Sequence, residues 1–446
     1  MENYDIIIVG GGPAGLFLCY ELLKNNRNLK VCLIDRGKSI KQRTNKDVMF
    51  GIGGSGAFSD GKLHYSILLS HEKILDLYTV DEYRRILSYV DKVFTEFGVN
   101  AEYFPKDLEK TQDLVQDCKK KGVELFVRRI RHVGSDKLPS IINNIEDCLL
   151  HKGVVFKTEI EVIDIIVENG QCRGVVTKNG KIYGKNIVLA PGRFSAIWLQ
   201  DIAKKYNIGF KHEPAEIGVR VEFPKSVMKK YADLMYEAVF LIHTKTFDDA
   251  IRTYCPCPEG HVAQETYKDY VCVNGHSNSS HDSENSNFAF VSIVNLTEPT
   301  ENTIKYAESI AKLSNTIGGG RPIIQRLKDL QRGRRSTWGR INKSFVSPSL
   351  KDVTPGDISM ALPGRIVTNI IEGLESLDKV MPGINSGHTL LYAPEVKLRT
   401  SKIAANRELE TNIKNLYVAG DGSGWSGNTV GAAATGIIVA HGILKK

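Results

Sequence analysis

The stretch Ile6-Ile7-Ile8-Val9-Gly10-Gly11-Gly12-Pro13-Ala14-Gly15 joins an apolar run to the spacing G-x-G-x-x-G. A continuous β-branched run that ends in glycine is typical of a buried parallel strand. Helical spacing follows over 14–24, and a second apolar run over 31–34 ends at Asp35 and Arg36. A strand, a glycine turn, a helix and an acid about twenty residues further on form the fingerprint of a dinucleotide-binding βαβ unit. We expect Asp35, with Arg36 beside it, to accept hydrogen bonds from the ribose hydroxyls.

The residues of the glycine turn have separate tasks in such a unit. Gly10 permits the tight turn, Gly12 lets a pyrophosphate approach the backbone, and Gly15 lets the helix pack closely on the strand. Pro13 suits the first helical turn, where a missing N–H costs nothing. From Ala14 onward the helix offers free amides and a partial positive charge to a phosphate. A plain glycine turn is the alternative interpretation.

Two later segments resemble the other motifs of FAD-binding proteins. Residues 415–421 form an apolar strand that ends in Gly420 and Asp421, like the second FAD motif of glutathione-reductase-type flavoproteins. Residues 188–192 resemble the short strand and glycine turn, here Gly192, that the same proteins place between the two. Three motifs in this order indicate FAD, and they require a discontinuous domain with both ends of the chain in one sheet.

We therefore predict the α/β class, with a Rossmann-like FAD-binding domain and a second, mixed-sheet substrate domain. A chain of 446 residues is long enough for two such units. The predicted FAD-binding domain consists of 1–65, 135–205 and 385–446. A helical segment is expected over 66–134, and the substrate domain over 206–384.

Composition places the chain among globular proteins. The net charge of +8 suits a dinucleotide phosphate, an anionic substrate or RNA, and does not choose among them. The 8 cysteines are mostly scattered, which favours a reducing cytoplasm over a disulfide scaffold. The N-terminus lacks the basic region of a signal peptide. The longest mostly apolar stretch, 431–444, is too short to cross a membrane, so we expect a cytoplasmic protein.

Five further segments carry a resemblance to a known family. They are 53–63 (GGSGAFSDGKL), 255–258 (CPCP), 273–275 (VNG), 399–401 (RTS) and 420–427 (GDGSGWSG). The chain resembles the little-characterised bacterial FAD-dependent dehydrogenases that are distantly related to geranylgeranyl-reductase-type flavoproteins. It departs from them at Asp421 and Trp425, where they more often have Glu and Tyr. The resemblance implies the fold and FAD, but no substrate.

Two glycine-rich segments are expected to contact the cofactor. In the first, small residues let the backbone wrap a bulky ligand while serine and lysine offer donors; an ordinary surface loop is the alternative. The second opens the apolar last helix, whose N-terminus would face the pyrimidine end of the flavin; a core helix is the alternative. The candidate residues are Gly54, Ser55, Gly56, Ser59 and Lys62 in the first segment, and Gly427, Asn428 and Thr429 in the second.

The candidates for catalysis are Cys255, Cys257 and His388. The two cysteines are either a redox or substrate-facing pair or inert core residues. Their Cys-x-Cys spacing departs from that of zinc sites, so no metal is predicted. His388 is either a proton donor near the flavin or a structural histidine.

The densest basic stretch, 321–343, is either a solvated helix face or an anion-binding patch. Trp338 alone offers stacking within it, so nucleic acid is not favoured. We predict an FAD-dependent oxidoreductase that transfers hydride between flavin N5 and a small organic substrate. That substrate could be anionic, and a protein electron donor could dock. The alternatives are a flavin-dependent RNA-base-modifying enzyme and a flavin-binding redox sensor. The sequence lacks a second G-x-G-x-x-G, so we expect no dedicated NAD(P)H domain.

Overall fold

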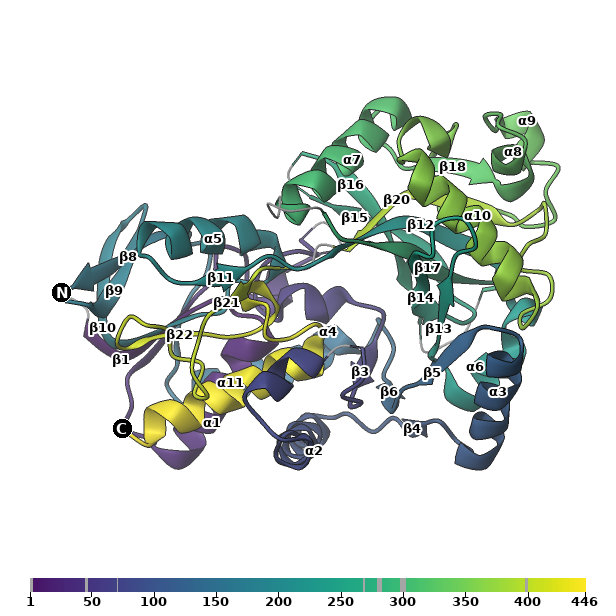
Figure 1. Ribbon diagram of the computed structural model, residues 1–446. Helices are drawn as coiled ribbons and strands as arrows, with labels where there is room; N and C mark the ends of the chain where they lie inside the picture. The colour runs from purple at the N-terminus through teal and green to yellow at the C-terminus, as the bar shows by residue number, and fades with distance from the viewer. Residues whose placement is uncertain are drawn as a thin grey trace.

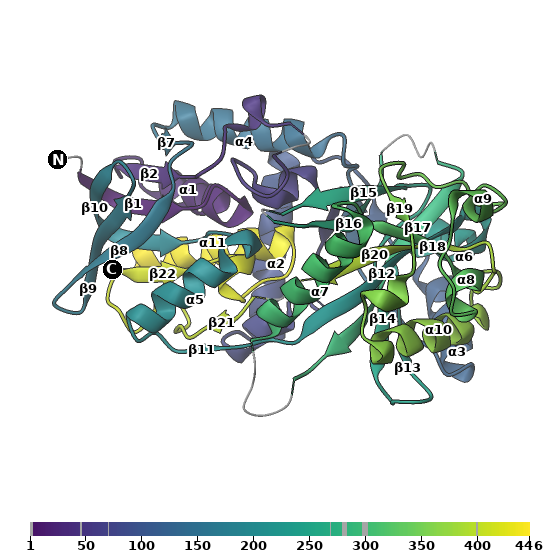
Figure 2. The same cartoon turned by 90° about the horizontal axis from the view of Figure 1, so that it is seen from above.

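The computed structural model describes residues 3–44, 47–69, 71–267, 269–278, 283–296, 302–397 and 400–446. Two lobes with separate hydrophobic cores lie side by side, and each is built around its own sheet (Figure 1). The N-terminal and C-terminal segments lie together in one lobe, as both views show (Figures 1 and 2).

The first sheet has the parallel centre that the fingerprint predicts. Among the described residues it contains seven strands in the order β7-β2-β1-β10-β9-β8, with β22 also paired to β10. The pairs β1–β2, β1–β10, β2–β7 and β10–β22 are parallel, so the first and last motifs of the chain share a sheet. The strands are β1 (Asn3–Val9), β2 (Val31–Ile34), β7 (Val155–Lys157), β8 (Val162–Glu168), β9 (Gln171–Thr177), β10 (Gly180–Leu189) and β22 (Leu416–Val418).

Two helices pack against each other in this lobe at close range. They are α1 (Pro13–Asn25) and α11 (Thr429–Leu444). A Cβ atom at Gly436 would lie 2.2 Å from the carbonyl oxygen of Ala14, so only glycine allows this approach. The other helices of the lobe are α2 (Val80–Glu96), α4 (Leu138–His151) and α5 (Ala196–Lys205).

The second sheet is mixed, as predicted. Its described strands, eight in number, run in the order β19-β18-β20-β12-β17-β14-β13-β5. They are β5 (Glu124–Val127), β12 (Ala215–Pro224), β13 (Ala238–His243), β14 (Ala250–Cys257), β17 (Asn285–Val294), β18 (Ile323–Arg326), β19 (Thr354–Pro355) and β20 (Leu390–Lys397). The hairpin β15 (His261–Thr266) and β16 (Val271–His276) lies beside it. The helices are α3 (Leu108–Lys120), α6 (Lys229–Met235), α7 (Thr303–Gly318), α8 (Leu327–Gln331), α9 (Trp338–Ile341) and α10 (Gly364–Asp378).

Two of the predicted boundaries are wrong. Strand β20 pairs with β12 and β18, so residues 390–397 belong to the second sheet and not to an FAD segment that begins at 385. The segment 66–134 contains strands as well as helices, since β5 joins the second sheet and β3 (Lys62–His64), β6 (Ile130–His132) and β4 (Tyr103–Phe104) form a small sheet. The strands within 66–134 are two to four residues long and are completed by distant partners, so they carry little periodicity of their own, which explains the second error.

Candidate active site

The glycine turn after β1 leaves space at one glycine and is closed at two others. A Cβ atom at Gly10, where φ is +113°, would lie 2.0 Å from the carbonyl oxygen of Ala190. A Cβ at Gly15 would lie 2.1 Å from the carbonyl oxygen of Gly10. Among the described residues, a Cβ at Gly12 would meet only Gly54, 3.9 Å away. The space at Gly12 adjoins the first amides of α1, so a phosphate fits there.

The Asp35 carboxylate is occupied by backbone groups. Its Oδ2 accepts the N–H of Gly11 at 2.8 Å, and its Oδ1 accepts those of Gly37 at 2.8 Å and Gly51 at 2.9 Å. Asp35 therefore clamps the glycine turn to the loop after β2. A carboxylate offers about four acceptor positions. The predicted ribose contact can thus use only what the clamp leaves, and it stays a prediction.

Two adjoining pockets run along the carboxyl ends of the parallel strands. The space between protein atoms is about 1420 Å³ in one and 920 Å³ in the other, open solvent included. Seven residues line both pockets, so they form one elongated site of the kind that an extended dinucleotide needs. They are Gly12, Met49, Gly54, Ser55, Ala190, Gly192 and Arg193.

The predicted cofactor-binding residues line this site, with one exception. Gly10, Asp35 and Arg36 line the smaller pocket only. The larger pocket alone is lined by Pro13, Ala14, Gly56, Ser59, Lys62, Gly420, Asp421, Gly427, Asn428 and Thr429. The exception is Gly15, which lies outside both pocket walls and packs α1 against β1, as its expected role requires.

The smaller pocket is lined by a partly buried arginine, Arg36, with one buried donor that a ligand could satisfy. The Arg36 guanidinium lies 4.7 Å from the ring centroid of Phe50 and 4.1 Å from that of Phe194. Its Nη2 is buried and has no hydrogen-bond partner among the described residues. Burial lowers the pKa of Arg36. A buried donor of this kind is normally satisfied, so it fits an oxygen of a bound dinucleotide.

The last helix points its N-terminus into the larger pocket. Asn428 caps α11 by accepting the N–H of Gly431 at 2.9 Å. Nearby, the Asp421 carboxylate accepts a hydrogen bond from Arg193 Nε at 3.1 Å and another from the Ser426 hydroxyl. Burial would lower the pKa of Arg193, but the charge of Asp421 raises it overall. The capped helix and this ion pair leave the helix amides facing a ligand site.

The opposite wall of the larger pocket comes from the second lobe. Its residues are Tyr254, Cys255, Gln264, Glu265, Tyr267, Asn274, His276, Glu395, Val396 and Lys397. Burial raises the pKa of Glu265 and raises that of Glu395 to about 8. Burial also lowers the pKa of Lys397 well below its ordinary value, and its ammonium nitrogen lies 3.0 Å from the ring centroid of Tyr254. This wall is therefore polar but poor in fixed charge.

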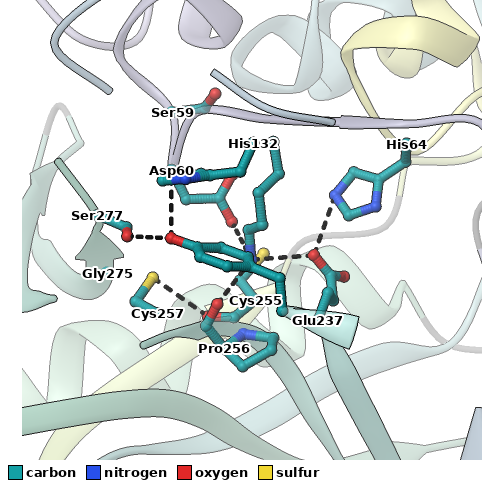
Figure 3. A network of polar contacts seen from close by, with 12 residues as sticks. Ser59, Asp60, His64, His132, Glu237, Cys255, Pro256, Cys257, Gly275 and Ser277 are labelled. Atoms are coloured by element: carbon teal, nitrogen blue, oxygen red, sulfur yellow. Dashed lines mark hydrogen bonds and ion pairs between the residues drawn. The ribbon is translucent and has the colours of Figure 1, made fainter. Parts of the chain in front are cut away.

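A buried ion network adjoins the larger pocket, which its members Asp60 and Lys62 line. Asp60, Glu237 and Pro256, which Figure 3 labels, all contact the amine of Lys62. Lys62 Nζ lies 2.8 Å from Asp60 Oδ2 and 3.0 Å from Glu237 Oε2, and it donates to the carbonyl oxygen of Pro256 at 2.8 Å. Glu237 also pairs with Arg128 at 2.7 Å. The Lys62 and Glu237 side chains are fully buried.

The network is ionised at neutral pH. Burial alone would lower the pKa of Lys62, but Asp60 and Glu237 raise it well above its ordinary value. Burial would raise the pKa of Glu237, but the neighbouring cations Lys62 and Arg128 lower it overall. Because His64 is buried beside these cations, its pKa falls to about 3 and it stays neutral.

These contacts bear on two expectations for the glycine-rich loop, which stay predictions. Lys62 was predicted to donate to the cofactor, but its amine is held by two carboxylates and a carbonyl. Ser59 was predicted as a donor too, and its hydroxyl donates to the carbonyl oxygen of Gly56 at 2.9 Å. Lys62 therefore lines the pocket while it joins the two lobes through its ion pair with Glu237.

The two cysteines of the CPCP segment differ in position. Cys255 lines the larger pocket and has a φ of +42°, beside an irregularity of the β14–β17 pairing. Cys257 is buried, with its sulfur 3.3 Å from Arg220 Nη2. Burial raises the pKa of both thiols. Among the described residues, no group of three or more His, Cys, Asp and Glu side chains could hold a metal ion.

Two other predicted features lie away from the pockets. His388 lines neither, and its ring lies 4.3 Å from that of Phe345, centroid to centroid. In the basic stretch, Arg326 and Arg334 both pair with the buried Asp329, so part of this charge is internal. Arg399, which belongs to the segment 399–401, lies outside the described residues.

Several residues of the site were not predicted. Arg193 directly follows Gly192 at the end of the second motif, so its position was available as a signal. Glu237, Glu265 and Glu395 belong to ordinary-looking strand segments. Sequence patterns give no sign that these three carboxyls are buried.

Comparison with known proteins supports the cofactor. Residues 214–398 match the family model of the FAD-dependent protein, C-terminal domain-like, and residues 5–52 match that of the lycopene cyclase protein. An uncharacterized protein of Clostridium beijerinckii is 25% identical and is covered over 80% of its length by 99% of this chain. The 8-methylmenaquinol:fumarate reductase flavoprotein subunit of Wolinella succinogenes is 24% identical over 46% of this chain and 34% of its own.

Solved structures resemble the chain only loosely. A quinol fumarate reductase variant of E. coli aligns with 100% of this chain and 71% of its own at 12% identity and a TM-score of 0.47. The L-proline dehydrogenase from P. horikoshii aligns with 100% of this chain and 94% of its own at 13% identity and a TM-score of 0.42. No helix in the described part of the chain has the length and apolarity to span a membrane. The dinucleotide cradle and the match over 214–398 to a model of FAD-dependent proteins agree, and FAD is the cofactor of this chain.

Proposed function

We propose that the chain oxidises or reduces a small organic molecule held between the FAD cradle and the wall of the second lobe. One observation carries this proposal: the larger pocket is lined by the phosphate-binding turn at one side and by strands β14, β16 and β20 with the β15 hairpin at the other. When bound, FAD supplies a ring that takes up or returns hydride at N5. The chain itself orients the substrate and moves protons.

Within that site the residues divide by position. The turn at Gly12 and the α1 amides would hold the pyrophosphate, with Arg36 at the adenosine end. Thr429 and its neighbours at the N-terminus of α11 would face the flavin ring. Glu395 and Lys397 would face the substrate from β20. An anionic substrate would meet Arg193, a cation of the pocket wall with a raised pKa.

The electron partner is proposed to bind without a second dinucleotide domain. In the described part of the chain, one sheet has a parallel centre followed by a glycine turn, as a dinucleotide domain needs. The second sheet is antiparallel where it faces the pocket. Electrons would then come from the organic substrate, from a transient nicotinamide or from a docked protein. We also propose the distant relation to geranylgeranyl-reductase-type flavoproteins, which rests on the glycine-rich loop 53–63 and the segment 420–427.

The test is anaerobic reduction of the FAD-loaded protein. NADH, NADPH and a panel of small alcohols, amines, hydroxy acids and amino acids are mixed with it in a stopped-flow instrument, and flavin absorbance is followed. We expect saturable bleaching by at least one organic compound. Bleaching by none of them, or recovery of protein without FAD, would contradict the proposal. Fast saturable reduction by NADH or NADPH with little salt dependence would contradict the view of the electron partner.

A further inference from the structure

A buried carboxyl group without a hydrogen-bond partner lies in the substrate wall. The Glu395 side chain is 9% exposed and lines the larger pocket from strand β20. Its Oε2 is buried and has no hydrogen-bond partner among the described residues. Native structures rarely leave such an atom unsatisfied unless it has a functional role or a ligand to meet.

Arg220, which is held in place by hydrogen bonds, lies beside the Glu395 carboxyl group. Arg220 is fully buried, and its Nη1 lies 3.8 Å from Glu395 Oε2, too far for a hydrogen bond. The guanidinium is held from its other side: Nε donates to Asn287 Oδ1 at 2.7 Å, and Nη2 donates to the carbonyl oxygen of Cys255 at 2.7 Å. Gly275 leaves room for it, since a Cβ there would lie 1.8 Å from Nη2.

From this arrangement, which rests on the proposed function, we infer that Glu395 is the catalytic residue that exchanges a proton with the substrate and that Arg220 is its positioning residue. With FAD bound, the flavin would supply the two-electron oxidant that takes hydride from the substrate, and the Glu395 carboxylate takes the proton of the neighbouring O–H or N–H group. The C–O or C–N bond of the substrate becomes a double bond, and the Glu395 carboxyl group is then protonated and uncharged. In the reverse direction the carboxyl returns the proton. The inferred substrate class is therefore an alcohol or amine, or its carbonyl or imine counterpart.

The surroundings make both forms of Glu395 accessible near neutral pH. Burial raises its pKa to about 8, Arg220 on β12 and Lys397 on β20 oppose that rise, and Glu265 on β15 adds to it. The Cys272 thiol on β16 also interacts with the charge of Glu395, and it stays neutral because burial raises its pKa. A group with a pKa near the working pH transfers protons most efficiently in both directions.

Infrared spectroscopy tests the carboxyl without any substrate. The FAD-loaded protein is titrated from about pH 6 to pH 10 while the C=O stretching band of protonated carboxyl groups is followed. We expect a band that titrates near pH 8, is absent in Glu395→Gln, and remains in Glu265→Gln with its midpoint shifted to lower pH. A band that persists in Glu395→Gln, or no such band in the wild type, would overturn the inference.

Two further variants examine Arg220 and catalysis. A Cβ in Gly275→Ala would lie 1.8 Å from Arg220 Nη2 and forces the guanidinium to move, so the midpoint of the band should shift; an unchanged midpoint would refute the positioning role. With any compound that bleaches the flavin, Glu395→Gln should slow reduction by about 100-fold or more and remove the pH dependence near pH 8, at unchanged FAD content. A pH dependence retained in Glu395→Gln would refute the catalytic role. If no compound bleaches the flavin, the proposed function is contradicted but the role of Glu395 is not, because the infrared titration still shows whether its carboxyl group titrates near pH 8.

Discussion

Replacing Gly12 by alanine should separate cofactor binding from folding. A Cβ at Gly12 lies in open space apart from Gly54 at 3.9 Å, and the φ of −70° is accessible to alanine. Alanine is a poorer N-cap than glycine by up to about 1 kcal/mol, while the loss of a flexible glycine from the unfolded chain returns about 0.4–1 kcal/mol. The free energy of unfolding of the protein without FAD should therefore change little.

The effect on FAD should be much larger. The new methyl group occupies the place where a phosphate would meet the first amides of α1. A hydrogen bond to a charged group contributes about 1.5–3 kcal/mol, so losing one weakens binding by about 10- to 100-fold. The measurement is fluorescence titration of the apoprotein with FAD, together with urea unfolding of the same apoprotein.

Gly10→Ala is the matched control. Its Cβ would lie 2.0 Å from the carbonyl oxygen of Ala190 at a φ of +113°, so this variant should lose about 2 kcal/mol or more of stability before any ligand is added. Gly12→Ala with unchanged FAD affinity, or with an apoprotein as unstable as Gly10→Ala, would refute the assignment of this space to the cofactor.

Three further predictions follow from the buried groups. Lys62→Met leaves the Asp60 and Glu237 carboxylates buried without this cation and should lower the free energy of unfolding by about 3–5 kcal/mol. Adding Asp60→Asn should restore part of that loss. Denaturant unfolding that finds the double variant no more stable than Lys62→Met would contradict the network. His71 is buried, and its pKa is lowered to about 3, below its value in the unfolded chain. The unfolded state therefore binds more protons between about pH 6.5 and 3. The free energy of unfolding should fall as the pH drops through that window, by up to about 1.4 kcal/mol per pH unit for this group. His71→Phe should flatten that slope, and an equally steep slope in the variant would argue against this residue. Cys257→Ser and His388→Ala should both keep FAD and the rate of flavin reduction, because neither side chain lines the pocket; a large loss of rate at full FAD content would show otherwise.

Local sequence was sufficient for the nucleotide-binding half of the molecule. The run Ile6–Val9, the glycine spacing and the strand before Gly420 are short-range patterns whose meaning does not depend on distant partners. They predicted an N-terminal βαβ unit, one sheet that holds both ends of the chain, the separate tasks of Gly10 and Gly15, and the space at Gly12.

Tertiary structure alone decided the chemistry of the second half. Lys62 meets Pro256 across 194 positions of the chain, and that crossing turns an expected cofactor donor into a buried ion pair. Glu395 and His388 lie seven positions apart, yet only Glu395 lines the pocket. Whether a carboxyl is solvated, paired or buried depends on which strands cover it, and periodicity does not encode that covering. Desolvation sets its pKa, so proton chemistry could be read only after the two sheets had been placed together.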